Sequence, residues 1–400
     1  MAKSVEQVRG DIPFLKTGVI YLDNAATTPT PEPIIAAMLE YFREYGVNVG
    51  RGLYRATRKA TEVFEGAREN VAKVINAAPD EIAYTKNTTE GINIVAQGLG
   101  LKRGDKVVTT ILEHHSNLLP WQRLQDRGVE LEVIGATSEC LLRPEDLEAA
   151  IDKNTRLIAT HHISNSIGSV QPVREIGKIA REHEILFLLD AAQSVGHMPV
   201  DVKKIGCDFL SAPGHKGLLG PQGTGFLYFR KDIGKKLKPL LVGGGIVLDA
   251  ETHRAELTEP PEIFDAGTPN IPGVIGLGRA CDYVLEIGVE KIEAQEKKLT
   301  EIMMKIKEFP NVAVYGPPSI ESRGGVVSFN IKGLGFHDVA AMLDELEKIA
   351  IRSGNHCAQP TMKHLGIGGT ARASVHYYNL EEEVSKFVEA VGKVSKELGG

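Results

Sequence analysis

The sequence has few cysteines and few aromatic residues for its length. Its 400 residues include four cysteines, one tryptophan and 6% aromatic residues in all. No CxxC pair occurs among them, so we expect neither a disulfide scaffold nor a zinc module, and no bound metal. This cysteine usage is typical of a reducing compartment, and a cytoplasmic location is therefore expected.

Long apolar runs and an excess of positive charge are also missing. Apolar runs such as Ile185–Leu189 are far shorter than the roughly 18 residues of a membrane span. The first residues are polar and do not resemble a signal peptide. With 46 Lys and Arg against 52 Asp and Glu, the net charge is −6. Since phosphate binding requires a basic surface, nucleic acid is not the expected partner, and no membrane association is expected either.

The overall composition is that of a folded globular protein. Hydrophobic residues make up 42% and charged residues 24%, which excludes wholesale disorder. The length predicts two or three domains with a large core.

Apolar strand patterns alternate with helical patterns between about Tyr21 and Arg230. The expected strands are 106–111, 131–136, 156–163 and 185–190, and the helices between them include 33–45, 144–151 and 173–183. Strands that alternate with helices form a largely parallel sheet covered on both faces. Ligands of such sheets gather at the carboxyl ends of the strands.

The pattern changes from about Pro272 onward. A long helical stretch from Gly273 to about Phe309 is expected there, followed by strand 326–331, helix 337–350, strand 371–378 and a terminal helix. The sequence therefore predicts an α/β domain with a smaller α+β domain after it.

Asp190 and Lys216 are the first candidates for a catalytic site. Asp190 ends the apolar run ILFLLD, and Lys216 lies in the glycine-rich segment GHKGLLGPQG. Each residue alone has a simpler explanation, a helix-capping aspartate or a solvated lysine. Together they are what pyridoxal phosphate requires. The lysine forms a Schiff base, and the carboxylate keeps the pyridine nitrogen protonated so that the ring can accept electrons.

A candidate phosphate site comes earlier, in TKNTTEGIN. Asn87 is a suitable helix N-cap, and Glu90 three residues later completes a capping-box pattern. Free N–H groups and the helix dipole attract phosphate, and the hydroxyls of Thr88 and Thr89 would be further donors. Taken alone, a capped helix without a ligand is the simpler interpretation.

Two pairs of adjacent histidines occur, His114-His115 and His161-His162. Neighbouring residues of a strand point to opposite faces, so neither pair can chelate one metal ion. A histidine of the first pair, after strand 106–111, could stack on a flat ring and move protons. A buried, hydrogen-bonded core histidine is the alternative.

Cys357 is the candidate nucleophile among the cysteines. It follows Arg352 and His356 in a loop, where nearby cations and exposure would favour the thiolate. An incidental loop cysteine is the alternative. Arg372, which begins a strand after GIGGT, could bind a substrate carboxylate with its guanidinium fork.

Nine segments along nearly the whole chain resemble the class V aminotransferase family of fold type I pyridoxal phosphate enzymes. They are, in order, YLDNAATTPTP, TKNTTEGIN, EHHSNLLPW, HHISNSIGSVQP, LDAAQSVGH, GHK, FDAGTPN, RSGNHCAQP and RASVHYYN. Each is weak alone, but nine in family order are specific. The short cysteine loop is similar to that of the SufS-like branch, which contains cysteine desulfurases and selenocysteine lyases.

The resemblance implies a mostly parallel seven-stranded sheet in a large domain, residues 18–271, and a smaller α+β domain formed by residues 1–17 and 272–400. It implies pyridoxal 5′-phosphate bound to Lys216, with Asp190 at the pyridine nitrogen. The other implied cofactor contacts are Gln193 at the phenolic oxygen, His114 on the ring, and Thr88, Thr89 and His215 at the phosphate, with Thr268 added from a second subunit. The site therefore implies a homodimer.

The resemblance also implies roles for the substrate side of the site. Asn165 and Arg372 would hold the substrate carboxylate, with Arg352 nearby, and Cys357 would accept sulfur. The implied enzyme is a cysteine desulfurase that converts L-cysteine to L-alanine and forms a persulfide on Cys357. It would supply sulfur for iron–sulfur cluster or thio-cofactor assembly, through an acceptor or scaffold protein of the SUF type. A selenocysteine lyase or another β-lyase that does not require Cys357 is the alternative.

Overall fold

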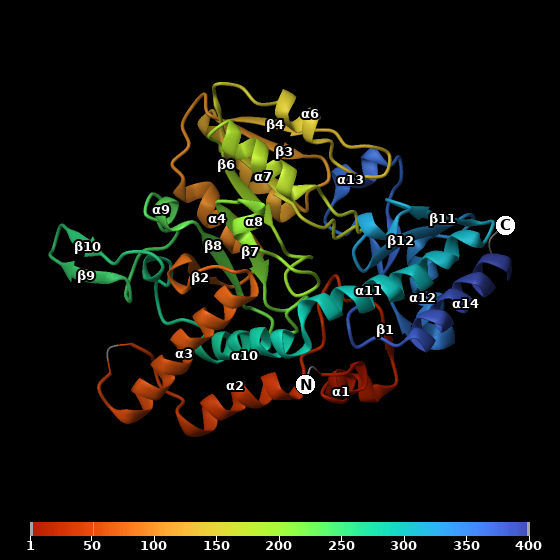
Figure 1. Cartoon of the computed structure of the whole chain (residues 1–400), viewed down its shortest axis with the longest axis horizontal. Coiled ribbons are helices and arrows are strands. Elements are labelled where there is room, and N and C mark those ends of the chain that lie inside the picture. Colours follow the sequence, from red (N-terminus) through yellow and green to blue (C-terminus); the bar gives the residue numbers. More distant parts are fainter. Residues whose placement is uncertain (1–2, 51, 398–400) are drawn as a thin grey trace.

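The structure is a computed structural model that describes residues 3–50 and 52–397 of the chain. Its larger sheet has seven strands in the order β2-β8-β7-β6-β5-β3-β4 (Figure 1). The strands are Ile82–Thr85 (β2), Gly225–Phe229 (β8), Phe209–Pro213 (β7), Leu186–Asp190 (β6), Thr155–His161 (β5), Lys106–Thr110 (β3) and Glu130–Ile134 (β4). All pairings are parallel except those of β8 with β7 and β2. The expected mostly parallel seven-stranded sheet is confirmed.

Side chains of the central strands alternate between two apolar layers. In β6, Phe187 and Leu189 pack on one face of the sheet, and Leu188 between them packs on the other. The first layer includes Glu32–Glu44 (α2), Arg55–Val74 (α3), Val173–Glu182 (α7), Val202–Ile205 (α8) and Ile271–Ile287 (α10); the second includes Thr88–Gly98 (α4), Leu119–Leu124 (α5) and Lys231–Gly234 (α9). Because helices cover both faces, these strands are apolar on both sides.

A smaller antiparallel sheet of four strands lies to the right in Figure 1. Its order is β11-β12-β15-β14, formed by Val312–Tyr315, Val326–Ile331, Thr370–Ser374 and Arg352–Gly354. The helices Val289–Met303 (α11), Phe336–Glu347 (α12) and Glu381–Glu397 (α14) share an apolar core with it. The remaining elements are Val5–Gly10 (α1), Pro144–Ala149 (α6), Gln359–His364 (α13), the pair Ile20–Tyr21 (β1) with Ile349–Ala350 (β13), and the hairpin Val247–Ala250 (β9) with Ala255–Leu257 (β10).

Two of the expected C-terminal helices are wrong in extent. The helical stretch from Gly273 to Phe309 is interrupted at Gly288, whose φ of 93° lies in the left-handed region that ends helices. The expected helix 337–350 ends at Glu347, because Lys348 also has a left-handed φ of 54°. The two residues after it pair with β1 instead. The expected strand 371–378 ends at Ser374.

The two sheets have separate apolar cores. Helix α10 packs in the core of the larger sheet. The division into residues 18–271 and residues 1–17 with 272–400 stays a prediction, and residues 1–2 and 398–400 of these ranges lie outside the described residues. No helix in the described part of the chain is both long and apolar enough to cross a membrane.

Candidate active site

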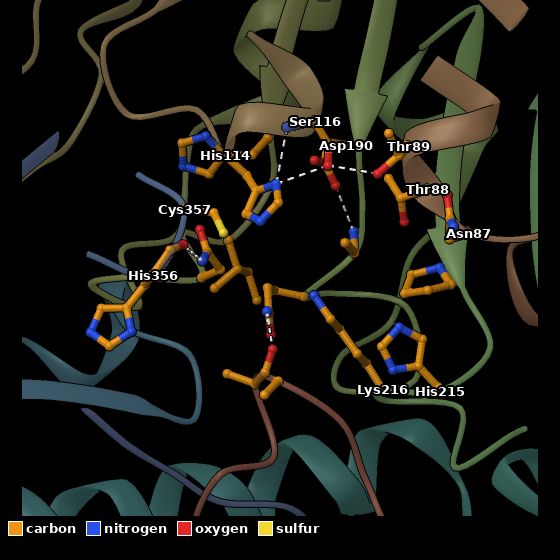
Figure 2. Close-up of a pocket in the computed structure, with 18 of the residues that line it drawn as sticks. Asn87, Thr88, Thr89, His114, Ser116, Asp190, His215, Lys216, His356 and Cys357 are labelled. Carbon is orange, nitrogen blue, oxygen red and sulfur yellow. Dashed lines mark hydrogen bonds between the residues drawn. The ribbon is translucent and has the colours of Figure 1, made fainter. Parts of the chain in front are cut away.

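A cavity of about 310 Å³ lies at the carboxyl ends of the parallel strands, where the smaller sheet meets them (Figure 2). This volume suits a small ligand. Every predicted site residue except Thr268 lines it, namely Thr88, Thr89, His114, Asn165, Asp190, Gln193, His215, Lys216, Arg352, Cys357 and Arg372. Side chains from both sheets therefore meet in one cavity.

Asp190 and Lys216 are both buried at this edge of the sheet. Asp190 ends β6, and its Oδ1 accepts a hydrogen bond of 3.0 Å from the backbone N–H of Ala192. Burial raises the pKa of Asp190 to about 6, although the Ala192 bond opposes the shift. Burial lowers the pKa of Lys216 to about 8, although the charge of Asp190 opposes it. A lysine with this pKa has an appreciable neutral fraction near neutral pH, which a nucleophilic amine requires.

The N-terminus of α4 opens into the cavity. Asn87 caps the helix, since its Oδ1 accepts from the backbone N–H of Glu90 at 3.0 Å. In a capping box the Glu90 carboxylate would accept from the backbone N–H of Asn87. Here it accepts instead from the backbone N–H of Lys86, one residue earlier, at 2.6 Å. The Thr88 hydroxyl is buried and has no hydrogen-bond partner among the described residues. A helix N-terminus with a free buried hydroxyl fits a phosphate group.

A close contact holds this helix over the sheet. A Cβ atom on Gly91 of α4 would lie 2.3 Å from Ser211 Oγ of β7. Only glycine permits this approach. It fixes the distance between β7, the strand that leads to Lys216, and the phosphate cup, by which we mean the N-terminus of α4 with Thr88 and Thr89.

Two histidines in the cavity are neutral near physiological pH. Burial lowers the pKa of both His114 and His215 to about 4. The Nδ1 atom of His114 accepts from the backbone N–H of Ser116 at 3.0 Å, so its proton is on Nε2. The Nδ1 atom of His215 lies 3.2 Å from Thr27 Oγ1. Both rings can therefore act as uncharged groups toward a cofactor, in the roles that the resemblance implies.

Arg372 of β15 is buried in a network that joins the two sheets. Its Nη1 donates to the backbone oxygen of Asn165 at 2.8 Å, and its Nη2 donates to Asp23 Oδ1 at 3.0 Å. Its Nε is buried without a partner among the described residues. This free donor in the cavity wall fits a bound carboxylate. Sequence reasoning missed Asp23, although it stands in the YLDN segment directly after β1.

The loop that carries Cys357 is ordered by contacts from the larger sheet. The backbone N–H of His115 donates to the carbonyl of Cys357 at 2.9 Å, and the Asn165 amide donates to the carbonyl of His356 at 2.7 Å. Both loop residues have left-handed φ angles, 52° at His356 and 55° at Cys357. Cys357 is exposed, whereas the other three cysteines are buried.

The expectation that His356 contributes positive charge to Cys357 is wrong. Burial lowers the pKa of His356 to about 3, and its Nε2 is within 2.8 Å of Thr370 Oγ1. The cations that share the cavity with Cys357 are Lys216, Arg352 and Arg372.

Gln193 lines the cavity, whereas Thr268 lies outside it. The Gln193 amide donates to the carbonyl of Ala25 at 2.8 Å and lines the cavity, with a second N–H left for a ligand. Thr268 is exposed and does not line the cavity of its own chain. Its predicted role toward a second subunit stays a prediction.

Sequence reasoning also missed a buried pair beneath the cavity. The Glu113 carboxylate, which is fully buried, lies 2.8 Å from His161 Nδ1. His161 ends β5 beside Asp190 in the parallel register, and its Nε2 is buried with no hydrogen-bond partner in the described part of the chain. The adjacent histidines in HHIS were a visible signal, but only the fold shows which of them faces the site.

The class-V aminotransferase family model matches residues 20–387. The chain belongs to the class-V aminotransferase family. A Methanothermobacter thermautotrophicus protein described as a probable cysteine desulfurase is 50% identical over 99% of this chain and 98% of its own length. The apo cysteine desulfurase of Thermococcus onnurineus NA1 has 48% identity and a TM-score of 0.96, with both chains fully covered. The Escherichia coli cysteine desulfurase CsdA, in an S-sulfonic acid form, has 30% identity and a TM-score of 0.92, again over both whole chains.

Family membership confirms the resemblance that the nine segments carried. In a class-V aminotransferase the cavity residues are expected to hold pyridoxal phosphate, and the free Thr88 hydroxyl, Asp190 and Lys216 fit its phosphate, ring nitrogen and aldehyde carbon.

The substitution Lys216→Ala is expected to abolish covalent attachment of pyridoxal phosphate. The purified wild-type protein should be yellow, and borohydride reduction followed by peptide mapping should place the cofactor on Lys216. The variant should give no such peptide, although cofactor can still be held non-covalently. As a control, Lys236→Ala should behave like the wild type. Reductive labelling of another lysine in wild-type protein would contradict the assignment.

The substitution Asp190→Asn is expected to stabilise the cofactor-free protein at pH 8. The folded-state pKa of about 6 lies above the ordinary 3.8, so stability should fall as the pH rises from about 4 to about 6. Removing the carboxyl removes this penalty, which is about 3 kcal/mol. The Tm of the variant apoprotein should exceed that of the wild type at pH 8 and match it near pH 4.

Asp232→Asn is the matched control for this prediction. Asp232 is exposed, and its hydrogen bond with Arg230 lowers its pKa, so this variant should gain no stability at pH 8. An Asp190→Asn apoprotein that is less stable than wild type at pH 8 would contradict the prediction.

Proposed function

We propose that the chain is a pyridoxal phosphate-dependent cysteine desulfurase, which converts L-cysteine to L-alanine and leaves the sulfur as a persulfide on Cys357. The observation that carries the proposal is the convergence of Lys216, Arg372 and the exposed Cys357 on one cavity. A lysine, a carboxylate-binding arginine and a thiol are the three groups that this reaction needs.

The chain's own residues would hold the cofactor at three points. The α4 N-terminus with Thr88 and Thr89 would bind the phosphate, Asp190 the ring nitrogen, and Lys216 the aldehyde carbon. When bound, pyridoxal phosphate supplies an electron sink for the Cα electrons of the amino acid.

Arg372 and Lys216 would act on the substrate. The buried guanidinium of Arg372, fixed by Asp23 and the Asn165 carbonyl, would bind the carboxylate of L-cysteine through its free Nε–H. The Lys216 amine, with its pKa lowered to about 8 by burial, would take the Cα proton at Nζ and return it to the product.

Cys357 would take the sulfur. Its Sγ, as thiolate, attacks the sulfur of the substrate, so that an S–S bond forms and the Cβ–S bond breaks. The electron pair of the broken bond stays on Cβ, which is protonated as the product becomes alanine. The enzyme keeps one sulfur as a persulfide, and no external oxidant or reductant is consumed.

The named relatives support the substrate. Two relatives that are each 50% identical to this chain are described as probable cysteine desulfurases. The exposure of Cys357 supports transfer of the sulfur onward, because an acceptor protein could reach it. We therefore propose, as the family branch suggests, a cytoplasmic enzyme that supplies sulfur to an acceptor or scaffold protein of the SUF type for iron–sulfur cluster or thio-cofactor assembly.

A selenocysteine lyase is the second candidate function. The same cavity would accept selenocysteine, and the weaker C–Se bond lets selenium leave without attack by a thiolate. Cys357 separates the two, because only desulfuration of L-cysteine needs it.

The substitution Cys357→Ser is expected to abolish persulfide formation while pyridoxal phosphate still binds. Alanine production from L-cysteine should fall by more than about 100-fold, since removal of a nucleophile leaves only positioning effects. Activity with selenocysteine should fall less. The measurements are alanine release from each substrate and mass spectrometry for an adduct of about 32 daltons on the Cys357 peptide.

Cys281→Ala is the matched control, because Cys281 is fully buried in α10 and does not line the cavity. It should keep wild-type activity and the adduct. If Cys357→Ser releases alanine from L-cysteine at the wild-type rate, the lyase function replaces the desulfurase proposal.

We also propose that the protein is a homodimer built on the larger sheet's side of the molecule. An apolar patch on residues 240–248, formed by Leu240, Leu241, Val242 and Leu248, is solvent-exposed in the single chain, with exposures from 41% at Leu240 to 72% at Val242. The loop that carries Thr268 is hydrogen-bonded to this segment, since the backbone N–H of Gly267 donates to the carbonyl of Gly244 at 2.7 Å. Leu240 lines a surface hollow together with Asn87 and Thr89. The patch therefore continues from the phosphate cup to Thr268.

A second apolar area supports the same interface. Phe42 is exposed near the end of α2, and Leu53 and Tyr54 are exposed in the connection between α2 and α3. This connection and the β9-β10 hairpin, in which Leu248 of the patch lies, both project on the left in Figure 1. Exposed apolar side chains of this number commonly mark a protein interface.

The substitution Leu241→Asp is expected to convert the dimer to a monomer, because it places a charge in an apolar interface. Sedimentation at micromolar concentration should show a wild-type dimer and a variant monomer with weakened cofactor binding. Leu346→Asp, at an exposed leucine of α12, should stay dimeric. A fully active wild-type monomer would contradict the proposal.

A further inference from the structure

Three buried side chains meet beside the turn that follows Lys216. His197, Glu296 and His376 form the one group of three metal-ligand side chains found close together among the described residues. They come from distant parts of the chain: His197 from the segment after β6, Glu296 from α11, and His376 from the residues just after β15. The mechanism proposed above uses none of them.

The hydrogen bonds of His376 fix its tautomer. Its Nδ1 accepts from the backbone N–H of Tyr377 at 2.7 Å, and its Nε2 lies 3.0 Å from the carbonyl oxygen of Gly217. A carbonyl can only accept, so the ring proton is on Nε2 and points at Gly217. Burial lowers the pKa of His376 to about 4, which keeps the ring neutral. Both ring nitrogens are occupied, so neither is free to bind a metal ion.

His197 and Glu296 complete the surroundings of Gly217. The Nδ1 atom of His197 lies 2.9 Å from Glu296 Oε1, and the His197 and His376 rings are 4.9 Å apart. A Cβ atom on residue 217 would lie 2.6 Å from His197 Cδ2 and 2.4 Å from the Val195 carbonyl. The His197 ring therefore packs directly on the Gly217 backbone, which only glycine permits.

Three consecutive carbonyl groups around Lys216 are held by donors from outside the turn. The Thr28 N–H donates to the His215 carbonyl at 2.9 Å, and the Thr28 hydroxyl donates to the Lys216 carbonyl at 2.7 Å. The third carbonyl, that of Gly217, is held by His376. The first two donors come from the N-terminal segment, and the third extends from the smaller sheet.

The strand that leads to His376 also carries the proposed substrate arginine. Arg372 lies in β15, four residues before His376. One short segment thus holds both the guanidinium group that would bind the substrate carboxylate and the N–H group that fixes the peptide after Lys216.

We propose that His376 is a positioning residue. Its Nε2–H holds the Gly217 carbonyl, the peptide after Lys216, and so fixes the position of the Lys216 amine relative to Arg372. His197 and Glu296 hold the ring and the turn in place. The inference rests on Lys216 as the cofactor lysine and is independent of the persulfide on Cys357.

His376→Leu tests the proposal, because leucine fills most of the buried volume of the ring but has no hydrogen-bond donor. The readout is the rate at which the apoprotein attaches pyridoxal phosphate to Lys216, followed by visible absorbance and borohydride trapping. We expect attachment to slow by about three- to tenfold, the factor that corresponds to one hydrogen bond. In the loaded enzyme, kcat should fall while the KM for L-cysteine changes little, since Arg372 keeps its partners.

His376→Gln is the rescue variant, since its amide nitrogen can occupy the position of Nε2. It should restore the attachment rate to within about twofold of wild type. If His376→Leu does not fold, His376→Asn replaces it, because its amide is too short to reach Gly217 and should cause the same slowing.

Tyr378→Phe is the matched control for a general loosening of this region. Tyr378 is buried, stacks on His376, and donates a hydrogen bond to Asn24 rather than to the lysine turn. It should lower the Tm to a similar extent and leave the attachment rate unchanged.

Three results with these variants would overturn the proposal: wild-type attachment by His376→Leu, equal slowing by Tyr378→Phe, and failure of His376→Gln to rescue. A stoichiometric metal ion in the purified wild type that is lost in Glu296→Gln would also overturn it, in favour of a metal site.

Discussion

The burial of a carboxylate and an amine at one edge of the larger sheet is the constraint on which the rest of the site depends. Desolvation disfavours the charged form of both groups, so it raises the pKa of Asp190 and lowers that of Lys216. Neither group has a charged partner at hydrogen-bond distance within the described residues. A ligand that offers Asp190 a protonated ring nitrogen, and Lys216 a carbonyl carbon, relieves both penalties. Asp190 and Lys216 are therefore placed to bind the cofactor.

The smaller sheet carries Arg372, which would bind the substrate carboxylate, and a few buried polar contacts fix its position relative to the larger sheet. Arg372 is tied to Asp23 and to the Asn165 carbonyl, and His376 is tied to Gly217. Truncating a buried charged partner is costly, because it leaves the other group unpaired. These contacts thus resist relative movement of Arg372 and the turn that follows Lys216, the two groups proposed to act on one substrate.

The cysteine loop adopts left-handed backbone at two non-glycine residues, whereas Arg372 does not. Left-handed backbone at non-glycine residues costs on the order of 1–3 kcal/mol each, and both His356 and Cys357 adopt it. The hydrogen bonds from His115 and Asn165 to the loop carbonyls offset this by about 0.5–1.5 kcal/mol each. The opposing terms lie within a few kcal/mol of each other, which would suit the role proposed for Cys357, a thiol that faces the cavity and passes sulfur to an acceptor outside it.

The sequence by itself determined the alternation of strands and helices, the position of Asp190 at a strand end, the capped helix at Asn87 and the family order of the nine segments. These features depend on residues close together in the chain, through periodicity, capping and turn chemistry. Gly288 shows the limit of such reasoning, because the apolar pattern continues across it and only its left-handed φ ends the helix.

Only the tertiary structure decided the partners and charge states of the site. Asp23 pairs with Arg372, which is 349 positions away in the chain. Glu113 contacts His161, and His376 donates a hydrogen bond to the Gly217 carbonyl. His356 looked like a cation in sequence, but burial makes it neutral. Hydrogen-bond partners and desolvation are set by which distant segments pack together. Local sequence does not encode that packing, so these features could be read only once the two sheets were in place.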